Sequence, residues 1–405
     1  MNKARSLFKA LIGKTLTHLI KNIINGILRI PELCAYLFSA KFKNAYAATS
    51  KFIHSTENYQ IDQNLHQKAA ERAMDNFRRQ MSEDVSEIFR PGMMWSNTIN
   101  KKKSFKEWEQ TGDDSIIKDR LLSFHRNDLI YGFRDTYTFG VPEDSSNNLR
   151  RNVYKTIKTY DEFIAGELTF DPQVIGTTDI GQNPYVIYGD KKLTLQFTRH
   201  AYYLNRMNQL QILNDSMIFG ELGSGAGGFV ITAKRLFPNA TFVCFDIPST
   251  LLTSSYNVMM NYPGLKIGLY DNFRGKYEIR PEDLQAFDFV MLPNWCIDRV
   301  KNDTLDVFYN VESLCEMEMA TIKNYLDIIE RITKKYFFTI NRNISLMANG
   351  AYMIPLDNFP FSPNSQIAHA QEDKAIDYFH QVLRNRCHYK ELLVKYKKNE
   401  GGLLS

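Results

Sequence analysis

The chain has 405 residues, enough for two or three domains, and its 44% apolar and 23% charged residues are ordinary values for a globular protein. Its net charge of +5 is concentrated at the beginning, since residues 1–56 carry nine Lys and Arg against one acid, which gives +8 there and −3 over the rest. A near-neutral remainder speaks against a nucleic-acid binder, and five widely spaced cysteines speak against a disulfide framework or a structural zinc site.

Residues 1–31 have the 3.6-residue period of an amphipathic helix that ends at Pro31. Its basic, acid-free polar face suits an anionic membrane surface, with packing on the rest of the protein, on a second copy, or use as a transit peptide as alternatives. No apolar run reaches the roughly 18 residues of a membrane span, and no secretory signal is evident. We expect a cytoplasmic protein, peripheral on the inner membrane face.

Residues 57–150 predict a mostly helical accessory or cap region. A run of helix formers covers residues 64–89 and is stopped by Arg90-Pro91-Gly92. Trp95 then precedes three lysines at 101–103, a combination that suits a sugar or an anionic ligand, or else a solvated loop. The polar stretch 141–148 indicates a domain seam. Three units are therefore predicted: 1–56, 57–150 and 151–405.

The pattern changes near residue 185, where a strand, a Gly189-Asp190 turn, a second strand and a helix follow one another. Strand and helix patterns then alternate to about residue 341, which predicts a parallel sheet covered on both faces. A helix and a last strand follow in the tail. The predicted fold class is α/β, a Rossmann-like sheet with a mostly helical N-terminal region; its strands fall at 217–222, 240–246, 286–293, 305–310 and 334–341.

A glycine-rich loop, "ELGSGAGG", joins the first of these strands to a helix. Gly223, Gly225 and Gly228 satisfy G-x-G-x-x-G, and glycine allows the backbone to turn sharply and approach a ligand. Asp246 ends the next strand, 23 residues after Gly223, where an acid accepts hydrogen bonds from ribose hydroxyls. The pattern predicts a nucleoside ligand and does not separate NAD from S-adenosylmethionine.

Glu221 helps to separate them, because it lies two residues before the first glycine. A carboxylate there repels the pyrophosphate of NAD but attracts the ammonium and sulfonium of S-adenosylmethionine. That Glu221 only bonds the local backbone is the alternative. We therefore expect S-adenosylmethionine as the cofactor.

The stretches "FGELGSGAGG" and "FDIP" resemble class I S-adenosylmethionine-dependent methyltransferases. Two longer stretches, at 181–207 and 305–343, resemble the bacterial sugar O-methyltransferase family, so the resemblance covers about residues 180–345. It implies a Rossmann-like class I methyltransferase sheet and transfer of a methyl group to a sugar hydroxyl, in surface polysaccharide biosynthesis. The substrate it implies is a small-molecule or lipid-linked sugar or glycan.

Ligands of open α/β sheets lie at the carboxyl ends of the strands. The residues there that we predict to bind the cofactor are Glu221, Gly223, Ser224, Gly225, Asp246, Ile247, Asn294, Trp295 and Asn310. Asn294 or Trp295 would flank adenine, with a plain loop role as the alternative. Asn341 and Arg342 are predicted to bind the substrate, Arg342 through an acidic sugar or a phosphate.

A sugar hydroxyl is a weak acid, so methyl transfer to it benefits from a positioned base. The predicted catalytic residues are Glu316 and Ser313, which follow a strand end, and His200 on the helix before the glycine loop. For Glu316 the alternative is a first-turn acid stabilised by the helix dipole, and for His200 a structural role. His369 is a further candidate, on an apparent loop. Asp246, Asp298 and Asp303 have no ligand-like spacing, so no metal ligand is predicted and metal dependence stays open.

Two other functions compete with methyl transfer. An NAD-dependent Rossmann oxidoreductase fits G-x-G-x-x-G, but Glu221 and the short tail after the sheet count against it. A non-catalytic, membrane-associated scaffold is the second, against which the intact Gly223, Gly225 and Asp246 count. Nucleic acid is not expected as a partner, and a homo-oligomer stays open.

Overall fold

The computed structural model describes residues 39–53, 61–130, 146–166, 168–170, 176–345, 347–348, 350–373, 375 and 389–397. The amphipathic segment predicted at residues 1–31 lies outside this part of the chain, as does the helix predicted in the tail. None of the helices in the described part is both long and apolar enough to cross a membrane.

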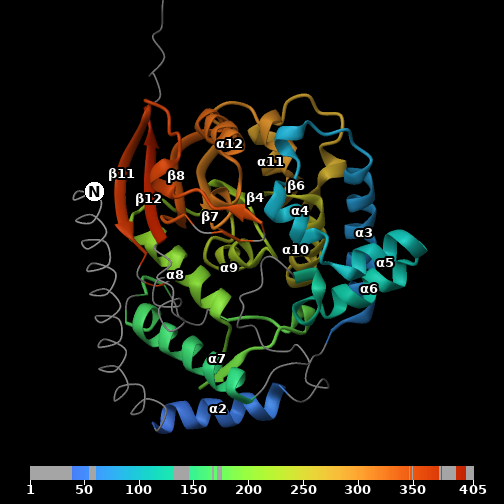
Figure 1. Ribbon diagram of the computed structural model, residues 1–405, viewed down its shortest axis with the longest axis vertical. Helices are drawn as coiled ribbons and strands as arrows, with labels where there is room; N and C mark the ends of the chain where they lie inside the picture. The colour runs from blue at the N-terminus through green and yellow to red at the C-terminus, as the bar shows by residue number, and fades with distance from the viewer. Residues whose placement is uncertain are drawn as a thin grey trace, which may run out of the picture.

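An eight-stranded sheet forms the centre of the molecule, in the order β11-β12-β8-β7-β3-β4-β6-β5 (Figure 1). Six strands are parallel, and β12 and β11 extend one edge antiparallel. This confirms the predicted α/β class. The strands are β3 (Ile218–Leu222), β4 (Thr241–Asp246), β5 (Ile267–Leu269), β6 (Phe289–Pro293), β7 (Leu305–Val311), β8 (Thr333–Arg342), β11 (Ser365–Glu372) and β12 (Tyr389–Tyr396).

The strand order reverses at β3, which has β4 on one side and β7 on the other. Chain connections leave such a switch point in opposite directions, so a crevice opens at the carboxyl ends of the flanking strands. The glycine-rich loop follows β3 directly. The topology therefore brings that loop to the place where an open α/β sheet binds its ligand.

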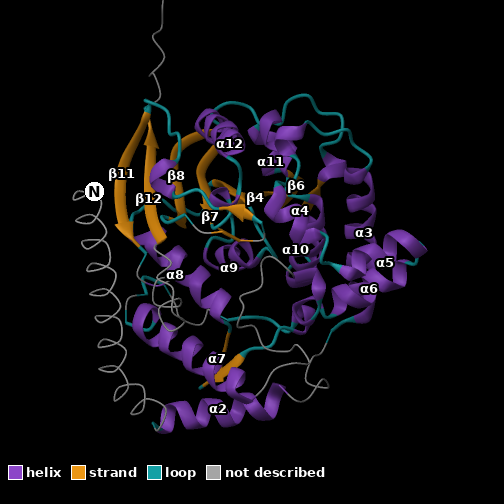
Figure 2. Cartoon of the chain, viewed as in Figure 1, coloured by secondary structure: helices purple, strands orange, loops and turns teal. Residues whose placement is uncertain are grey.

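Helices cover both faces of the sheet (Figure 2). Phe219 and Phe242 belong to the core shared with α8, α9 and α10, whereas Ile218 and Val243 belong to the core shared with α11 and α12. Successive strand residues thus enter opposite cores, as expected for strands buried on both faces. The helices are α8 (Leu195–Gln209), α9 (Gly228–Leu236), α10 (Pro248–Asn261), α11 (Pro281–Gln285) and α12 (Met319–Ile332).

The hairpin predicted around Gly189 is present as β1 (Val186–Tyr188) and β2 (Lys191–Leu193), followed by α8. It forms a two-stranded sheet of its own, apart from the main sheet. The hairpin packs with α2 (Ala40–Ile53) and α7 (Ser146–Thr159), and the amide of Ile187 donates to Thr49 Oγ1 at 3.0 Å. A second small hairpin joins β9 (Met347–Ala348) and β10 (Ala351–Tyr352).

The N-terminal helices α3 (Gln63–Met81), α4 (Met93–Ile99), α5 (Lys103–Thr111) and α6 (Asp114–Leu122) lie beside the sheet. Asp62 caps α3 by accepting from the amides of residues 64 and 65. Helix α3 packs on α10, and its Ala70 and Met74 are part of the core that contains Phe219. Helices α3, α5 and α6 and one face of the sheet therefore share a single hydrophobic core.

Helix α3 ends at Met81 rather than continuing to Phe89, as the sequence pattern predicted. The next residue, Ser82, closes the last turn through its amide, and Phe89 belongs to a separate 3₁₀ turn that starts at Glu87. The chain between the two helices is thereby free to leave α3 and run to the sheet. We call residues 86–95 the strap, because they lie along the ligand cavity.

Candidate active site

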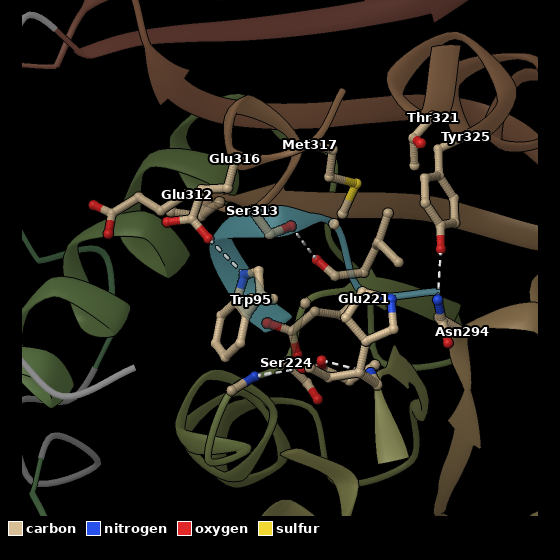
Figure 3. Close-up of a pocket in the computed structure, with 18 of the residues that line it drawn as sticks. Trp95, Glu221, Ser224, Asn294, Glu312, Ser313, Glu316, Met317, Thr321 and Tyr325 are labelled. Carbon is tan, nitrogen blue, oxygen red and sulfur yellow. Dashed lines mark hydrogen bonds between the residues drawn. The ribbon is translucent and has the colours of Figure 1, made fainter. Parts of the chain in front are cut away.

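A cavity of about 650 Å³ lies at the carboxyl ends of β3, β4, β6 and β7 (Figure 3). It is bounded by the glycine loop, by α8, by the turn after β7 and by the strap. The predicted site residues that line it are Glu221, Gly223, Ser224, Gly225, Asp246, Ile247, Asn294, His200, Ser313 and Glu316. The four that do not line it are Trp295, Asn310, Asn341 and Arg342.

The glycine loop forms the floor of the cavity because its backbone has a shape that other residues resist. Gly223 has φ +82°, in the left-handed region that favours glycine. A Cβ at this position would lie 2.5 Å from Ser313 Oγ. The loop can therefore follow β3 closely only with glycine, and the absence of a side chain leaves its backbone open toward the cavity.

Asp246 holds the loop from the neighbouring strand. Its carboxylate accepts from the amides of Gly225, at 3.0 Å, and Ile247, at 2.7 Å. Burial raises the pKa of Asp246 to about 7. The two hydrogen bonds from backbone amides and the charge of Lys102 oppose this effect, because they favour the ionised form. Further hydrogen-bond donors, such as ribose hydroxyls, would therefore stabilise the ionised form of Asp246.

Glu221 is a buried carboxyl group, 3% exposed, at the end of β3. Among the described residues its hydrogen-bond partner is the Cys244 thiol, 3.8 Å from Oε2, and no ion pair to it is found there. Burial raises the pKa of Glu221 well above its usual range, and the charge of Asp246 acts in the same direction. Two neighbouring buried acids, with Lys102 acting on Asp246 and no ion pair to Glu221 among the described residues, make this part of the cavity favourable for a positively charged group.

Asn294 joins the far wall of the cavity to the strap. Its Nδ2 donates to the Phe89 carbonyl oxygen at 2.7 Å. The same Nδ2 donates to the Tyr325 hydroxyl at 2.8 Å (Figure 3). Its Oδ1 is buried and lacks a partner within the described residues. An unpaired buried acceptor costs about 1–3 kcal/mol, so a donor on a ligand would be favourable here.

Asn310 and Asn341 are fully buried behind the glycine loop rather than exposed to the cavity. Asn310 Nδ2 donates to the Leu222 carbonyl at 2.9 Å, and Asn341 Nδ2 donates to Asn310 Oδ1 at 2.9 Å. The Ser313 hydroxyl, which does line the cavity, donates to the same Leu222 carbonyl at 3.2 Å. These side chains brace the end of β3 against β7 and β8.

Arg342 and Trp295 also lie away from the cavity. The Arg342 guanidinium lies over the Tyr389 ring, 5.0 Å from its centroid. Trp295 packs edge-on against Tyr270, with ring centroids 6.4 Å apart. Both positions follow strand ends, as the sequence indicated, but their side chains turn to other neighbours.

Glu316 and Glu312 are the acids after β7. The Glu316 carboxyl accepts from the Trp95 indole, with Nε1 2.8 Å from Oε2 (Figure 3). Burial raises the pKa of Glu316 to about 8. Glu312 has φ +57° and forms an ion pair with Arg199 of α8. A left-handed conformation at a residue other than glycine stores strain of the kind found at functional sites.

His200 lines the cavity beside the glycine loop, where its ring packs against Phe229 and Phe197. Burial and the charge of Arg199 lower the pKa of His200 to about 3. The imidazole is neutral at neutral pH and is a poor acceptor of a proton there.

His369 lies on strand β11 and not on a loop beside the cavity, which corrects the sequence-based expectation. The sequence of residues 364–373 predicted a loop on the active side of the sheet. Pairing with β12 makes it an edge strand, where polar residues are common. His369 Nε2 lies 3.0 Å from the buried Glu391 carboxylate, on the far edge of the sheet.

The cavity residues that were not identified from the sequence as parts of the site include Trp95 of the strap and Tyr325 of α12. The Phe89 carbonyl, which accepts from Asn294, was not identified either. Only Trp95 had a signal, its place near three lysines. Of these lysines, Lys102 is buried and donates to the Leu129 carbonyl at 2.9 Å. Within the described residues no group of three His, Cys, Asp or Glu is arranged to hold a metal ion.

No family model matches the chain, and no curated protein matches it. Solved structures of similar shape include a SAM-dependent methyltransferase from Aquifex aeolicus, with 12% identity, a TM-score of 0.31, and coverage of 47% of this chain and 89% of that one. Another is the magnesium protoporphyrin IX methyltransferase from Synechocystis with bound SAH, with 9% identity, a TM-score of 0.32, and coverage of 52% and 90%. At such scores the likeness carries no information about the substrate.

Proposed function

We propose that this protein is an S-adenosylmethionine-dependent O-methyltransferase that acts on a sugar hydroxyl. The observation that carries the donor part is the pair of buried acids Glu221 and Asp246 at the glycine loop, of which Glu221 has no ion pair among the described residues. A pyrophosphate would disfavour the ionised form of both acids and be repelled by it, whereas a ligand with an ammonium and a sulfonium would favour that form. An NAD-dependent oxidoreductase is disfavoured for the same reason.

The residues of the cavity fit S-adenosylmethionine in three respects. Glu221 offers a buried carboxyl group, and the cationic end of the ligand would stabilise its ionised form. Asp246 offers a carboxylate for ribose hydroxyls, and Asn294 offers the unpaired Oδ1 for the amino group of adenine. When bound, the cofactor supplies an electrophilic methyl group on a sulfonium.

The protein itself must align the acceptor hydroxyl and remove its proton. Glu316 is the group best placed for this role, because it lines the cavity on the β7 side. Since its pKa is raised to about 8, its ionised form, which can accept the proton, becomes populated at mildly alkaline pH. His200 is disfavoured as the base, because its pKa is too low for the proton to stay on it. Ser313 is committed to the Leu222 carbonyl and acts as a support for the loop.

The decisive experiment is isothermal titration of the full chain with S-adenosylhomocysteine, compared with Asp246→Ala. Hydrogen bonds to a charged group contribute about 1.5–3 kcal/mol, so the variant should bind about 10- to 100-fold more weakly. Asp327→Ala is the matched control, because Asp327 forms an exposed ion pair with Lys323 on α12. Failure of the wild-type protein to bind, or binding of NADH instead, would refute the methyltransferase proposal.

The sugar acceptor and a role in surface polysaccharide biosynthesis rest on the family resemblance, and a peripheral membrane contact rests on the basic pattern of residues 1–31. Deleting residues 1–31 should release the protein from anionic liposomes, since it removes the basic amphipathic face. Replacing Lys9, Lys14 and Lys21 by Gln is the matched variant that keeps the length. Equal co-sedimentation of all three proteins would exclude the anchor.

A further inference from the structure

Trp95 is the residue of the N-terminal helices that contacts the proposed base in the cavity. It belongs to α4, which begins directly after the strap turn at Pro91-Gly92, and it is half-buried against the cavity. Its indole Nε1 donates to one oxygen of Glu316, from a position 221 residues away in the sequence. The second carboxyl oxygen of Glu316 is not used by this bond.

The strap is held in place by more than this one bond. The Phe89 carbonyl receives Asn294 Nδ2, and the Phe89 ring meets Tyr325 edge-on, with centroids 5.9 Å apart. The Ser96 hydroxyl donates to the Pro91 carbonyl at 2.9 Å. Trp95 therefore approaches Glu316 from a segment anchored on both sides of it.

An indole N–H is a donor only, so it cannot exchange roles with the carboxyl group. It favours the ionised form of Glu316 and opposes the effect of burial on the Glu316 pKa. Besides this hydrogen bond, three charged groups act on Glu316: Glu312 and Asp246 disfavour its ionisation, and Arg342 favours it. Among Trp95 and these three groups, Trp95 is the one that touches the carboxyl group through a hydrogen bond.

We propose that Trp95 is a positioning residue that holds Glu316 by one oxygen and leaves the other directed to the methyl acceptor. The strap thereby contributes to the acceptor half of the site, and the N-terminal helices are part of the catalytic unit. This inference rests on the proposed function, because only an acceptor hydroxyl makes Glu316 a base.

The test uses the protonation of Glu316 itself and needs no acceptor. Difference infrared spectra of the full chain, recorded over a pH series, show the carbonyl band of a protonated buried carboxyl group, and Glu316→Gln identifies the band that belongs to Glu316. In the wild type its midpoint should lie near the raised pKa, about 8. In Trp95→Phe the midpoint should lie about one pH unit higher, because the donor is lost while an aromatic ring remains.

Trp108→Phe is the matched control, because the Trp108 indole donates to Asp114 at 3.0 Å, away from the cavity. It should leave the Glu316 midpoint unchanged. Trp95→His keeps a ring N–H and should restore a midpoint close to that of the wild type. It also carries the test if Trp95→Phe does not fold.

An unchanged midpoint in Trp95→Phe, an equal shift in Trp108→Phe, or the lack of any Glu316 titration would each overturn the inference. Titration of the same proteins with S-adenosylhomocysteine separates this failure from failure of the proposed function. Wild-type binding with an unchanged midpoint refutes only the role of Trp95. The lack of wild-type binding refutes the methyltransferase assignment.

Discussion

The two halves of the cavity are built in different ways. The donor half, from Glu221 to Asp246, comes from one continuous strand–loop–helix–strand unit. The acceptor half joins Trp95 to Glu316, residues that are 221 positions apart. Local sequence determines the first half, and packing of distant segments assembles the second.

The halves also differ in what holds them. The glycine loop is shaped by its backbone conformation and by the hydrogen bond from the Gly225 amide to Asp246. A Cβ added at Gly223 has no room there. On the other side, the contact of Trp95 with Glu316 is made by two side chains, which can be exchanged without moving the backbone. A substitution in the donor half should therefore cause a large loss of cofactor affinity. A substitution in the acceptor half should cause a smaller, graded change.

Gly223→Ala should have the largest effect. The residue would have to adopt φ +82° with its Cβ 2.5 Å from Ser313 Oγ, and the left-handed conformation costs about 1–2 kcal/mol while overpacking costs about 1–3 kcal/mol. We expect a lower free energy of unfolding and at least a tenfold loss of affinity for S-adenosylhomocysteine, equal to about 1.4 kcal/mol. Chemical denaturation and calorimetric titration measure the two effects.

Gly264→Ala is the control for this variant, because no atom lies within 4 Å of a Cβ at that position. It should bind like the wild type. Should Gly223→Ala also bind like the wild type, the loop is not the rigid element described above.

The pH dependence of cofactor binding should show a smaller effect. The pKa of Asp246 is about 7 in the free protein, and ribose hydroxyls favour its ionised form, so the pKa falls on binding. Affinity for S-adenosylhomocysteine should therefore rise with pH and level off above 7, with a loss of about five- to tenfold between pH 7.5 and pH 6. Titrations at several pH values check this, and Asp246→Asn should flatten the dependence. Tighter binding at the lower pH would have the wrong sign.

The smallest effect is expected from Trp95→Phe on cofactor affinity. Trp95 bonds to Glu316 and not to the glycine loop, so its loss should change the affinity for S-adenosylhomocysteine by less than about threefold, or about 0.6 kcal/mol. Calorimetric titration under the conditions used for Gly223→Ala gives the comparison. A loss as large as that of Gly223→Ala would show that the two halves are not separable.

Much of the donor half was predictable, because its signals are short-range. The spacing of Gly223, Gly225 and Asp246 indicated a strand, a turn and a second strand, and these elements are present. The strand ends after β6, β7 and β8 were also located correctly. The direction of the side chains there was not, as Asn310 and Asn341 are buried behind the loop instead of lining the cavity.

The sequence by itself determined the α/β alternation, the glycine loop and the acids beside it, because hydrophobic period and glycine conformation act between neighbouring residues. Only the tertiary structure decided that α3 ends at Met81, that the strap reaches the cavity, and that Trp95 meets Glu316. Such contacts depend on which helix packs on which strand, and no local pattern carries that information. The donor half of the site is therefore legible along the chain, and the acceptor half exists only once the chain has folded.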